Sequence, residues 1–342
     1  MNKNKKGRPT TYKSDLAKEY ILKYSEFSTL QIAKILSTEN PLDFPKLDSA
    51  RSIVRLYRGE LSKKDSASNP GKIVQKRTKE EKEKAQGWAS LPESDYEKLE
   101  DFAMPIGSSR VLVLSDIHIP YHDRKALKLA LEYGKEHKCN AVLLNGDTLD
   151  FFQLSRYIKD RRLRDFAGEL ELGKQFLESL QELQCPIYYK IGNHEERYEN
   201  YLKTVAPELL GVSNFRLSEL LEFGKYGVVE IKSKQLIKVG NLNILHGHEF
   251  GHSFFSPVNA ARGLYTRAKA DSVIGHHHQT SEHSEKDLNG NVVTTYSLGC
   301  LCGLQPEYMP FNKWNSGFGF VTFKPTGEFE VRNLRIINGV VK

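Results

Sequence analysis

The spacing of apolar positions changes character twice along the chain. Between residues 14 and 60, apolar side chains recur at helical intervals, which predicts helices over 14–26, 28–38 and 47–60. We expect Ser14 or Asp15 to cap the first helix, Asp48 or Ser49 to cap the third, and Gly59 to close it. The predicted inward positions are Leu16, Tyr20, Ile21, Tyr24, Leu30, Ala33, Ile35, Leu36, Ala50, Ile53, Val54 and Tyr57. The following Ser-, Pro- and Lys-rich stretch is typical of a linker.

From Arg110 on, short apolar runs alternate with amphipathic segments. We expect strands over 110–116, 140–147 and 185–193, with helices over 124–138 and 166–183 between them, an order that favours a parallel sheet. Hairpins are expected later, over 235–247, 284–299 and 319–334.

These elements predict an α/β fold in which two mixed β-sheets pack face to face and helices flank them, an αββα sandwich. A small all-α domain precedes it. We therefore divide the chain into a helical domain over 1–62, a linker over 63–105 and an α/β domain over 106–342.

Composition narrows the class of protein. Among the 342 residues, 39% are hydrophobic, enough for a core, and no apolar run approaches the ~18 residues that span a bilayer. The basic N-terminus lacks the apolar segment of a secretory signal. The four cysteines form no CxxC pair, and we expect Cys300 and Cys302 to be packed strand residues rather than metal ligands. We expect a soluble, cytoplasmic protein with no membrane partner.

Positive charge is concentrated near the N-terminus. Residues 1–79 carry a formal charge of +10 and the remaining residues −3, which together give the net +7. This asymmetry favours nucleic acid as a partner, with a basic solubilising tail as the alternative. Arg51, Arg55 and Arg58 lie on one face of the third predicted helix and can bind phosphates or guanine edges. The helices resemble a helix-turn-helix domain, although the connector over 38–46 is longer than its usual turn.

Metal-competent side chains follow five of the predicted strands. Because loops converge at the carboxyl ends of parallel strands, these residues are expected to meet at one site. They are Asp116 and His118, Asp147 and Asp150, Asn193 and His194, His246, and His276 and His278. If the last segment is extended, His276 and His278 face one way and His277 the other.

The ordered motifs Asp116-Ile-His118, Gly146-Asp147-Thr-Leu-Asp150, Gly192-Asn193-His194-Glu195, His246 and Gly275-His-His-His278 resemble the calcineurin-like metallophosphoesterase superfamily. The resemblance covers roughly residues 108–300. It implies one ion on Asp116, His118 and His278, a second on Asn193, His246 and His276, and Asp147 bridging both. His194 would act as general acid or transition-state stabiliser, oriented by Asp150. His277 and His248 are left for supporting or packing roles.

The nitrogen and oxygen donors suit two divalent ions, of which we expect manganese, with iron, zinc, cobalt or nickel as alternatives. The family's chemistry implies attack on phosphorus by a hydroxide that bridges the two ions.

One departure from the family pattern bears on the substrate. Its Ser/Thr protein phosphatases carry a phosphate-binding arginine after the second Asp, where this chain has Phe151. The cluster Arg156, Arg161, Arg162 and Arg164, or Arg197, is a candidate substitute, but solvated helix charge is the favoured role for most of these residues. The missing arginine counts against a dedicated phosphoprotein phosphatase and leaves room for diester cleavage, so we predict a nuclease-type phosphodiesterase targeted by the basic N-terminal domain. The alternatives are a phosphomonoesterase or cyclic-nucleotide phosphodiesterase with a partner-binding N-terminal domain, and a non-enzymatic regulator that keeps the fold.

Overall fold

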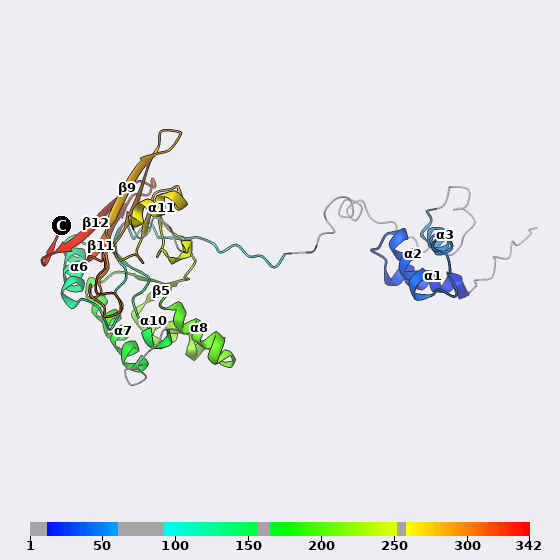
Figure 1. The fold of residues 1–342 in the computed structure, drawn as a ribbon, viewed down its shortest axis with the longest axis horizontal. Coiled ribbons are helices and arrows are strands. Elements are labelled where there is room, and N and C mark those ends of the chain that lie inside the picture. The colour runs from blue at the N-terminus through cyan, green and yellow to red at the C-terminus, as the bar shows by residue number, and fades with distance from the viewer. Residues whose placement is uncertain (1–11, 61–91, 93, 156–164, 252–257) are drawn as a thin grey trace, which may run out of the picture. The chain divides into compact units, whose positions relative to one another are not determined.

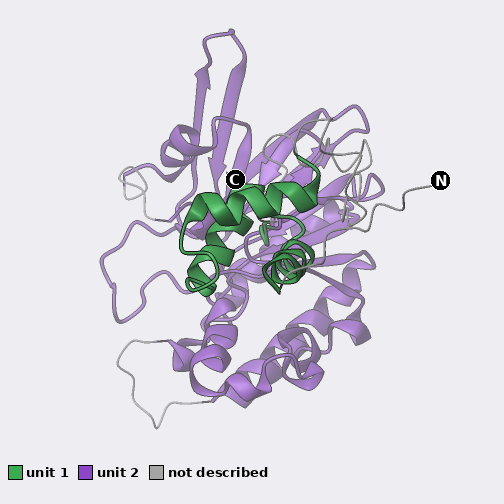
Figure 2. Cartoon of the chain, turned by 90° about the vertical axis from the view of Figure 1, so that its right-hand side faces the viewer, with its two compact units in different colours: residues 1–96 green, residues 97–342 purple. Residues whose placement is uncertain are grey.

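The computed structural model describes residues 12–60, 92, 94–155, 165–251 and 258–342. The chain divides into two compact units, residues 1–96 and 97–342 (Figure 2). The predicted linker over 63–105 lies mostly outside the described residues. Its predicted C-terminal end is wrong, because Phe102–Ala103 form strand β1 and pair with a strand of the larger unit. No helix in the described ranges is long and apolar enough to cross a lipid bilayer.

Residues 12–60, the part of the first unit that the structure describes apart from a few residues at its end, form three helices around a small core. They are α1 (Tyr12–Lys23), α2 (Thr29–Glu39) and α3 (Leu47–Arg58). Ser28 begins α2 with a reciprocal pair of bonds, since its hydroxyl accepts from the Gln31 N–H and the Gln31 side chain accepts from the Ser28 N–H. Gly59 ends α3 in the left-handed conformation, with φ of 72°, as predicted. The core consists of Ala17, Ile21, Ile32, Ala33, Leu36, Phe44, Ala50, Val54 and Tyr57.

Three details of this unit differ from the prediction. Helix α1 begins at Tyr12, ahead of Ser14 and Asp15, so neither residue caps it. Helix α3 begins at Leu47 and places Asp48 in its first turn, because Phe44 of the connector is buried in the same core and brings the chain into α3 directly afterwards. In α2, Leu30 was predicted to face inward but is exposed, and Ile32 is buried instead.

The larger unit is built on two sheets. A seven-stranded sheet has the order β13-β12-β11-β2-β3-β4-β5, and a six-stranded sheet has the order β1-β6-β7-β8-β10-β9. The first contains β2 (Arg110–Leu114), β3 (Ala141–Asn145), β4 (Ile187–Lys190), β5 (Val228–Ile231), β11 (Gly317–Phe323), β12 (Phe329–Ile337) and β13 (Val340–Val341). The second adds to β1 the strands β6 (Ile237–Val239), β7 (Leu242–Ile244), β8 (Ser272–Ile274), β9 (Ser281–Lys286) and β10 (Val292–Ser297).

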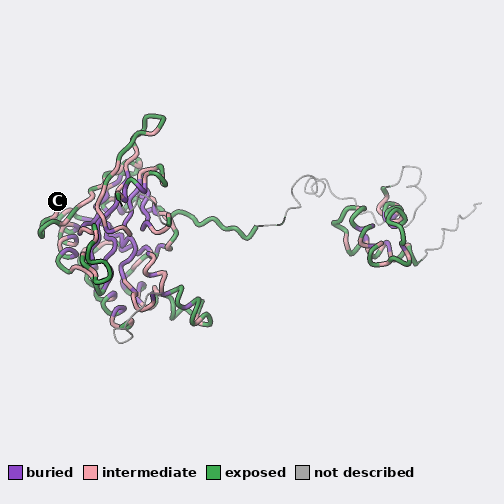
Figure 3. The backbone as a smooth tube through the Cα atoms, in the orientation of Figure 1, coloured by how far each residue is buried: buried purple, intermediate pink, exposed green. Residues whose placement is uncertain are grey.

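The helices lie on the outer faces of the two sheets (Figure 1). One core joins the seven-stranded sheet to α6 (Arg124–Glu136), α7 (Phe166–Leu180) and α8 (Glu196–Val205). A second core, with Val113 and Leu143 opposite Ile244 and Val273, lies between the sheets. Helix α11 (Ala260–Ala268) covers the six-stranded sheet through Leu264. The short helices α9 (Leu217–Leu220) and α10 (Phe223–Tyr226) precede β5. The predicted αββα sandwich is confirmed, and its buried interior is visible in Figure 3.

The strand directions explain where a site can form. β2, β3 and β4 are neighbours and run parallel, and β7 and β8 are parallel neighbours in the other sheet. Their carboxyl ends therefore bring the loops of five strands together. The three predicted hairpins are present as antiparallel pairs, β6 with β7, β9 with β10, and β11 with β12.

Candidate metal centre

The structure brings together the side chains that the sequence places at these strand ends. The loops after β2, β3, β4, β7 and β8 supply them, and every one is buried or half-buried. They are Asp116, His118, Asp147, Asp150, Asn193, His194, His246, His276 and His278.

The first part of the cluster joins β2 to β8. The Nε2 atoms of His118 and His278 lie 3.2 Å apart, and His278 Nε2 is 3.2 Å from Asp116 Oδ1. The Nδ1–H of His118 donates to Asp150 Oδ2 at 2.9 Å. With its proton held there, His118 directs its other nitrogen into the space it shares with His278. Two nitrogens and a carboxylate oxygen thus face one point, as the ligands of a cation do.

The second part joins β3 and β4 to β7 and β8. His246 Nε2 lies 3.2 Å from both Asp147 Oδ2 and Asn193 Oδ1, and its Nδ1–H donates to the Asn145 carbonyl at 2.8 Å. Asp147, His246 and His276 offer ligand atoms within 4.8 Å of one another. Asp147 also groups with His118 and His194 in the same way, so it is common to both parts of the cluster.

The electrostatics of this cluster favour positive charge. Burial alone would lower the pKa of His246, but the Asp147 carboxylate raises it to about 10. At His278, burial likewise lowers the pKa of the ring, but the Asp116 carboxylate raises it to about 10. The carboxylates therefore stabilise cations at these positions, as protons on the rings or as metal ions in their place. Oxygen and imidazole donors suit manganese, iron, zinc or cobalt.

Cys302 also lies within ligand distance of this cluster. It groups with His118 and His278, but its Sγ is 3.9 Å from Nδ1 of His278, whereas the Nε2 of that ring faces Asp116. The thiol therefore contacts the nitrogen that points away from the shared space. Cys300 and Cys302 are both buried, in agreement with the packed positions expected for them.

Several of these residues adopt a backbone conformation that L-residues rarely use. Asp116, His118, Asp147, His276 and His278 have φ between 52° and 62°. Each such position costs about 1 kcal/mol or more, and such strain concentrates at functional sites. The prediction that His276 and His278 align through an extended segment is wrong, because β8 ends at Ile274 and turns follow. The left-handed residues, not strand alternation, direct both rings into the cluster.

His194 lies at the edge of the cluster beside Arg197. Its Nδ1–H donates to the backbone carbonyl of Asp150 at 2.8 Å, while Nη2 of Arg197 lies 2.9 Å from its Nε2. Burial would lower the pKa of His194, but the Asp147 and Asp150 carboxylates raise it. The Asp150 carboxylate, expected to orient His194, makes its shorter contact with His118, at 2.9 Å against 3.4 Å. Asp150 thus orients one ring with its side chain and the other with its backbone.

Glu195 is a functional residue to which sequence reasoning assigned no role. Its carboxylate is buried and accepts from the N–H groups of Asp147, Thr148, Leu149 and Gly192 and from the Tyr189 hydroxyl. It therefore fastens the loop after β3 to the loop after β4. Its place directly after Asn193-His194 was the available signal, because it belongs to the same motif.

A buried ion pair supports the loop after β7 in a similar way. The ammonium group of Lys190, which is fully buried, lies 3.0 Å from Oε1 of Glu249 and donates to the Ser233 and Gln235 carbonyls. Glu249 accepts from the N–H of His246. Neither residue carries a sequence signal, since the pair arises only when β4 lies beside β5 and the loops after β5 and β7 pack together.

Residues 109–301 match the model of the calcineurin-like phosphoesterases, more than half of the chain. The chain belongs to the calcineurin-like phosphoesterase family. The phosphoesterase is therefore a hydrolase acting on ester bonds, and its family chemistry is phosphoester hydrolysis with two metal ions. It is 30% identical over 229 residues to the "Gene 54 protein" of Mycobacterium phage L5, a match covering 63% of this chain and 89% of that protein. The corresponding protein of Mycobacterium phage D29 is 28% identical over the same coverage.

Solved structures with similarity include Vps29 from Entamoeba histolytica complexed with zinc, with a TM-score of 0.36 and 13% identity, covering 68% of this chain and 96% of that one. A dimetal phosphatase from Danio rerio has a TM-score of 0.33 and 9% identity, covering 64% of this chain and 94% of that one.

Phe151, which replaces the arginine of the family's protein phosphatases, is fully buried in the core of the phosphoesterase. Its N–H and that of Asp150 donate to the carboxylate of Glu169 on α7, at 2.6 and 2.9 Å. The position is thus structural and offers no group to a phosphate. Of the substitutes considered, residues 156–164 lie outside the described residues, and Arg197 lies beside His194.

Glu169 predicts a pH dependence of stability. Burial raises its pKa to about 7, above the ordinary value of 4.5. Its contribution to folding is therefore complete below pH 4.5 and is lost as pH rises through 7. We expect Glu169→Gln, which keeps an acceptor for both N–H groups, to gain in Tm relative to the wild type between pH 5 and pH 8.

Thermal denaturation at both pH values measures this difference. Glu171→Gln, at an exposed position of the same helix, is the matched control and should track the wild type. A difference in Tm between Glu169→Gln and the wild type that stays constant with pH contradicts the prediction.

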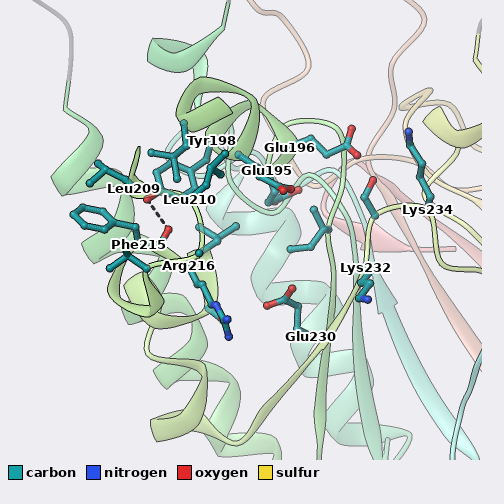
Figure 4. Close-up of a pocket in the computed structure, with 18 of the residues that line it drawn as sticks. Glu195, Glu196, Tyr198, Leu209, Leu210, Phe215, Arg216, Glu230, Lys232 and Lys234 are labelled. Carbon is teal, nitrogen blue, oxygen red and sulfur yellow. Dashed lines mark hydrogen bonds between the residues drawn. The ribbon is translucent and has the colours of Figure 1, made fainter. Parts of the chain in front are cut away.

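A cleft of about 640 Å³ lies beside α8 (Figure 4). Apolar side chains such as Leu202, Leu210 and Phe215 line one part, and Glu230 and Lys232 line another. None of the seven predicted metal ligands is among its lining residues, and Glu195 is its link to the cluster. The cleft is therefore not where the metal ligands converge.

The three arginines predicted to bind nucleic acid differ in their exposure and contacts. Arg51 and Arg55 are exposed on α3. Arg58 is half-buried, and its guanidinium donates to the carbonyls of Ser25 and Phe27 at 2.9 and 2.7 Å. Those bonds tie the end of α3 to the turn before α2, so Arg58 has a structural role that its spacing with Arg51 and Arg55 did not indicate.

Proposed function

We propose that this phosphoesterase is a nucleic-acid phosphodiesterase targeted by its basic N-terminal unit. The observation that carries the catalytic part is the position of Asp147, whose Oδ2 lies 3.2 Å from His246 Nε2 and 4.0 Å from His118 Nε2. One carboxylate can therefore serve two ions. Asp116, His118 and His278 would hold one, and Asn193, His246 and His276 the other, with manganese the ion we expect.

Two divalent ions bound there would withdraw charge from the phosphoryl oxygens and lower the pKa of the attacking water. The protein's own contribution centres on His194. Its Nδ1–H is held by the Asp150 carbonyl, so Nε2 is the nitrogen that meets the substrate. As water adds to phosphorus and the ester P–O bond breaks, His194 would give a proton from Nε2 to the departing oxygen. Nε2 can carry that proton only when the Arg197 guanidinium, which donates to it in this structure, has turned to a phosphoryl oxygen. The guanidinium of Arg197, beside that nitrogen, is placed to bind a phosphoryl oxygen.

Two features support a diester in nucleic acid over a phosphoprotein. The position of the phosphatases' arginine is filled by a buried phenylalanine, and the excess positive charge of the chain lies within residues 1–79. An assay with Mn²⁺ on single-stranded DNA, duplex DNA, RNA, a cyclic nucleotide and a phosphopeptide tests the proposal. Cleavage confined to the phosphopeptide or the cyclic nucleotide would overturn it in favour of those alternatives.

The exposed arginines of α3 give a second test. We expect the double variant Arg51→Gln/Arg55→Gln to bind DNA about tenfold more weakly at 0.1 M salt and to lower the salt slope by about 2, because each lost phosphate contact removes about 0.9. Hydrolysis of a small chromogenic diester should not change, since α3 lies outside the catalytic unit.

Fluorescence anisotropy across a salt series measures the affinity. The matched control is Lys128→Gln/Lys324→Gln, which removes two exposed charges from the catalytic unit and should bind as the wild type does. Equal losses in both double variants would refute targeting by α3.

A further inference from the structure

A loop beside the metal cluster exposes large apolar side chains to solvent. It comprises residues 303–315, which we call the aromatic loop, between the end of the isolated bridge at Cys302 and strand β11. Phe311 is 96% exposed and Tyr308 is 73% exposed. Exposing this much aromatic surface is unfavourable in water, so such surface marks a binding site when it gathers in one place.

The aromatic loop is attached directly to the segments that carry the candidate ligands. At its start, the N–H of Gly303 donates to the carbonyl of Tyr121 at 2.9 Å, three residues after His118. At its end, the N–H of Asn315 donates to the carbonyl of His278 at 3.0 Å. The ring of Trp314 packs edge-on against the ring of His278, with centroids 4.1 Å apart. The loop therefore borders the Asp116–His118–His278 half of the cluster.

Hydrogen bonds fix the shape of this loop. The Asn312 amide group donates to the carbonyls of Leu304 and Met309, both at 2.8 Å, and its oxygen accepts from the Trp314 N–H at 2.8 Å. Tyr308 contacts Trp314 edge-on, with centroids 6.3 Å apart. Tyr121, itself 58% exposed, adds a further ring on the side of His118. The rings are thus presented by a pre-organised backbone, which lowers the entropy lost on binding.

We propose that the aromatic loop is a stacking platform for a nucleobase adjacent to the scissile phosphate, and that it selects single-stranded nucleic acid as the substrate. This inference rests on the proposed phosphodiesterase function. A phosphate held at the cluster places its ester substituents next to these rings, and a flat, unpaired base is the group that aromatic side chains bind with little dependence on sequence. The loop carries one acid, Glu307, and one base, Lys313, so its charges cancel and its contribution is apolar contact.

Two small esters isolate the base from the phosphate. Thymidine 5′-(p-nitrophenyl phosphate) and methyl p-nitrophenyl phosphate share a leaving group and differ in the nucleoside. We expect the wild type to prefer the first by tenfold or more in kcat/KM, mainly through KM. Trp314→Ala and Phe311→Ala should each lower that preference severalfold, whereas Trp314→Phe should keep it. Because Trp314 packs on His278, a lower rate in Trp314→Ala is not by itself evidence of lost base binding. The ratio of the two esters cancels any general effect on the rate.

Tyr201→Ala, at a 41% exposed position on α8, is the matched control and should leave the ratio unchanged. A ratio of kcat/KM for the two esters that is unchanged in both Trp314→Ala and Phe311→Ala would overturn the platform. So would variants that change the oligomeric state in sedimentation and leave the ratio unchanged.

Tryptophan fluorescence gives a readout that does not need turnover. The chain has two tryptophans, so in full-length Trp88→Phe the emission comes from Trp314 alone. We expect oligothymidylate to quench it at lower concentration than an abasic oligomer of the same length and charge. Equal quenching by both would refute stacking. If the wild type hydrolyses neither ester but the oligomers still differ, the proposed diesterase function fails while the base-binding site stands.

Discussion

Asp147→Asn is expected to lower metal-dependent hydrolysis by about 1000-fold, equivalent to about 4 kcal/mol of transition-state stabilisation. The variant preserves the shape of the side chain but removes the negative charge shared by the two halves of the cluster. It also replaces an acceptor that faces His246 at 3.2 Å with a group that can present N–H donors there. Two metal ions that share this carboxylate as a ligand would then bind weakly, or only one of them would bind.

Two measurements on the purified variant separate this result from misfolding. Elemental analysis should find less than the two ions per chain expected of the wild type, and circular dichroism should show an unchanged fold. Asp165→Asn is the control, because Asp165 caps α7 at the Gly168 N–H and Asn can do the same. Full activity in Asp147→Asn, or a metal content of that variant equal to that of the wild type, would refute the shared-carboxylate site.

Glu195→Ala is expected to destabilise the protein by about 4 kcal/mol, because it orphans four buried backbone N–H groups and the Tyr189 hydroxyl. The two loops that this carboxylate joins carry Asp147 and Asn193, so metal affinity should fall with stability. Glu195→Gln keeps the side-chain volume, but an NH2 group replaces one carboxylate oxygen. This group then faces either the N–H groups of Asp147 and Gly192 or the donors that bind the other oxygen. We expect an intermediate loss.

Urea denaturation measures the loss of stability in Glu195→Ala and in Glu195→Gln. Glu199→Gln, on the exposed face of α8, which begins directly after Glu195, removes a surface carboxylate paired with Lys203 and should cost less than about 0.5 kcal/mol. If Glu195→Ala unfolds at the urea concentration of the wild type, the carboxylate does not fasten the two loops.

The order of strands and helices could be predicted from periodicity because the helices bury one face and the central strands bury both. Runs such as Val111 to Leu114 and Ala141 to Leu144 are apolar throughout, which is typical of strands covered on both sides, and both are buried. Helix starts were less readable. α3 begins where Phe44 enters the core, and no local capping residue marks that point.

The site residues were readable from motif order, but the reasons for their geometry were not. His276 and His278 were expected to align by strand alternation, and they meet the cluster through left-handed residues after β8 has ended. Arg58 was grouped with Arg51 and Arg55 by spacing, although its guanidinium binds the carbonyls of Ser25 and Phe27. In both cases the deciding contact comes from a segment distant in sequence.

By itself, the sequence determined the class of fold, the residues of the metal cluster and the unequal charge of the two ends, because these depend on local periodicity, residue type and order. Tertiary structure alone decided the left-handed backbone that directs His276 and His278 into the cluster, how Glu195 and Lys190 support the loops, and which aromatic side chains border the cluster. Those outcomes depend on contacts between β-strands and loops far apart along the chain, and the free energy of such contacts is set only when the two sheets pack together.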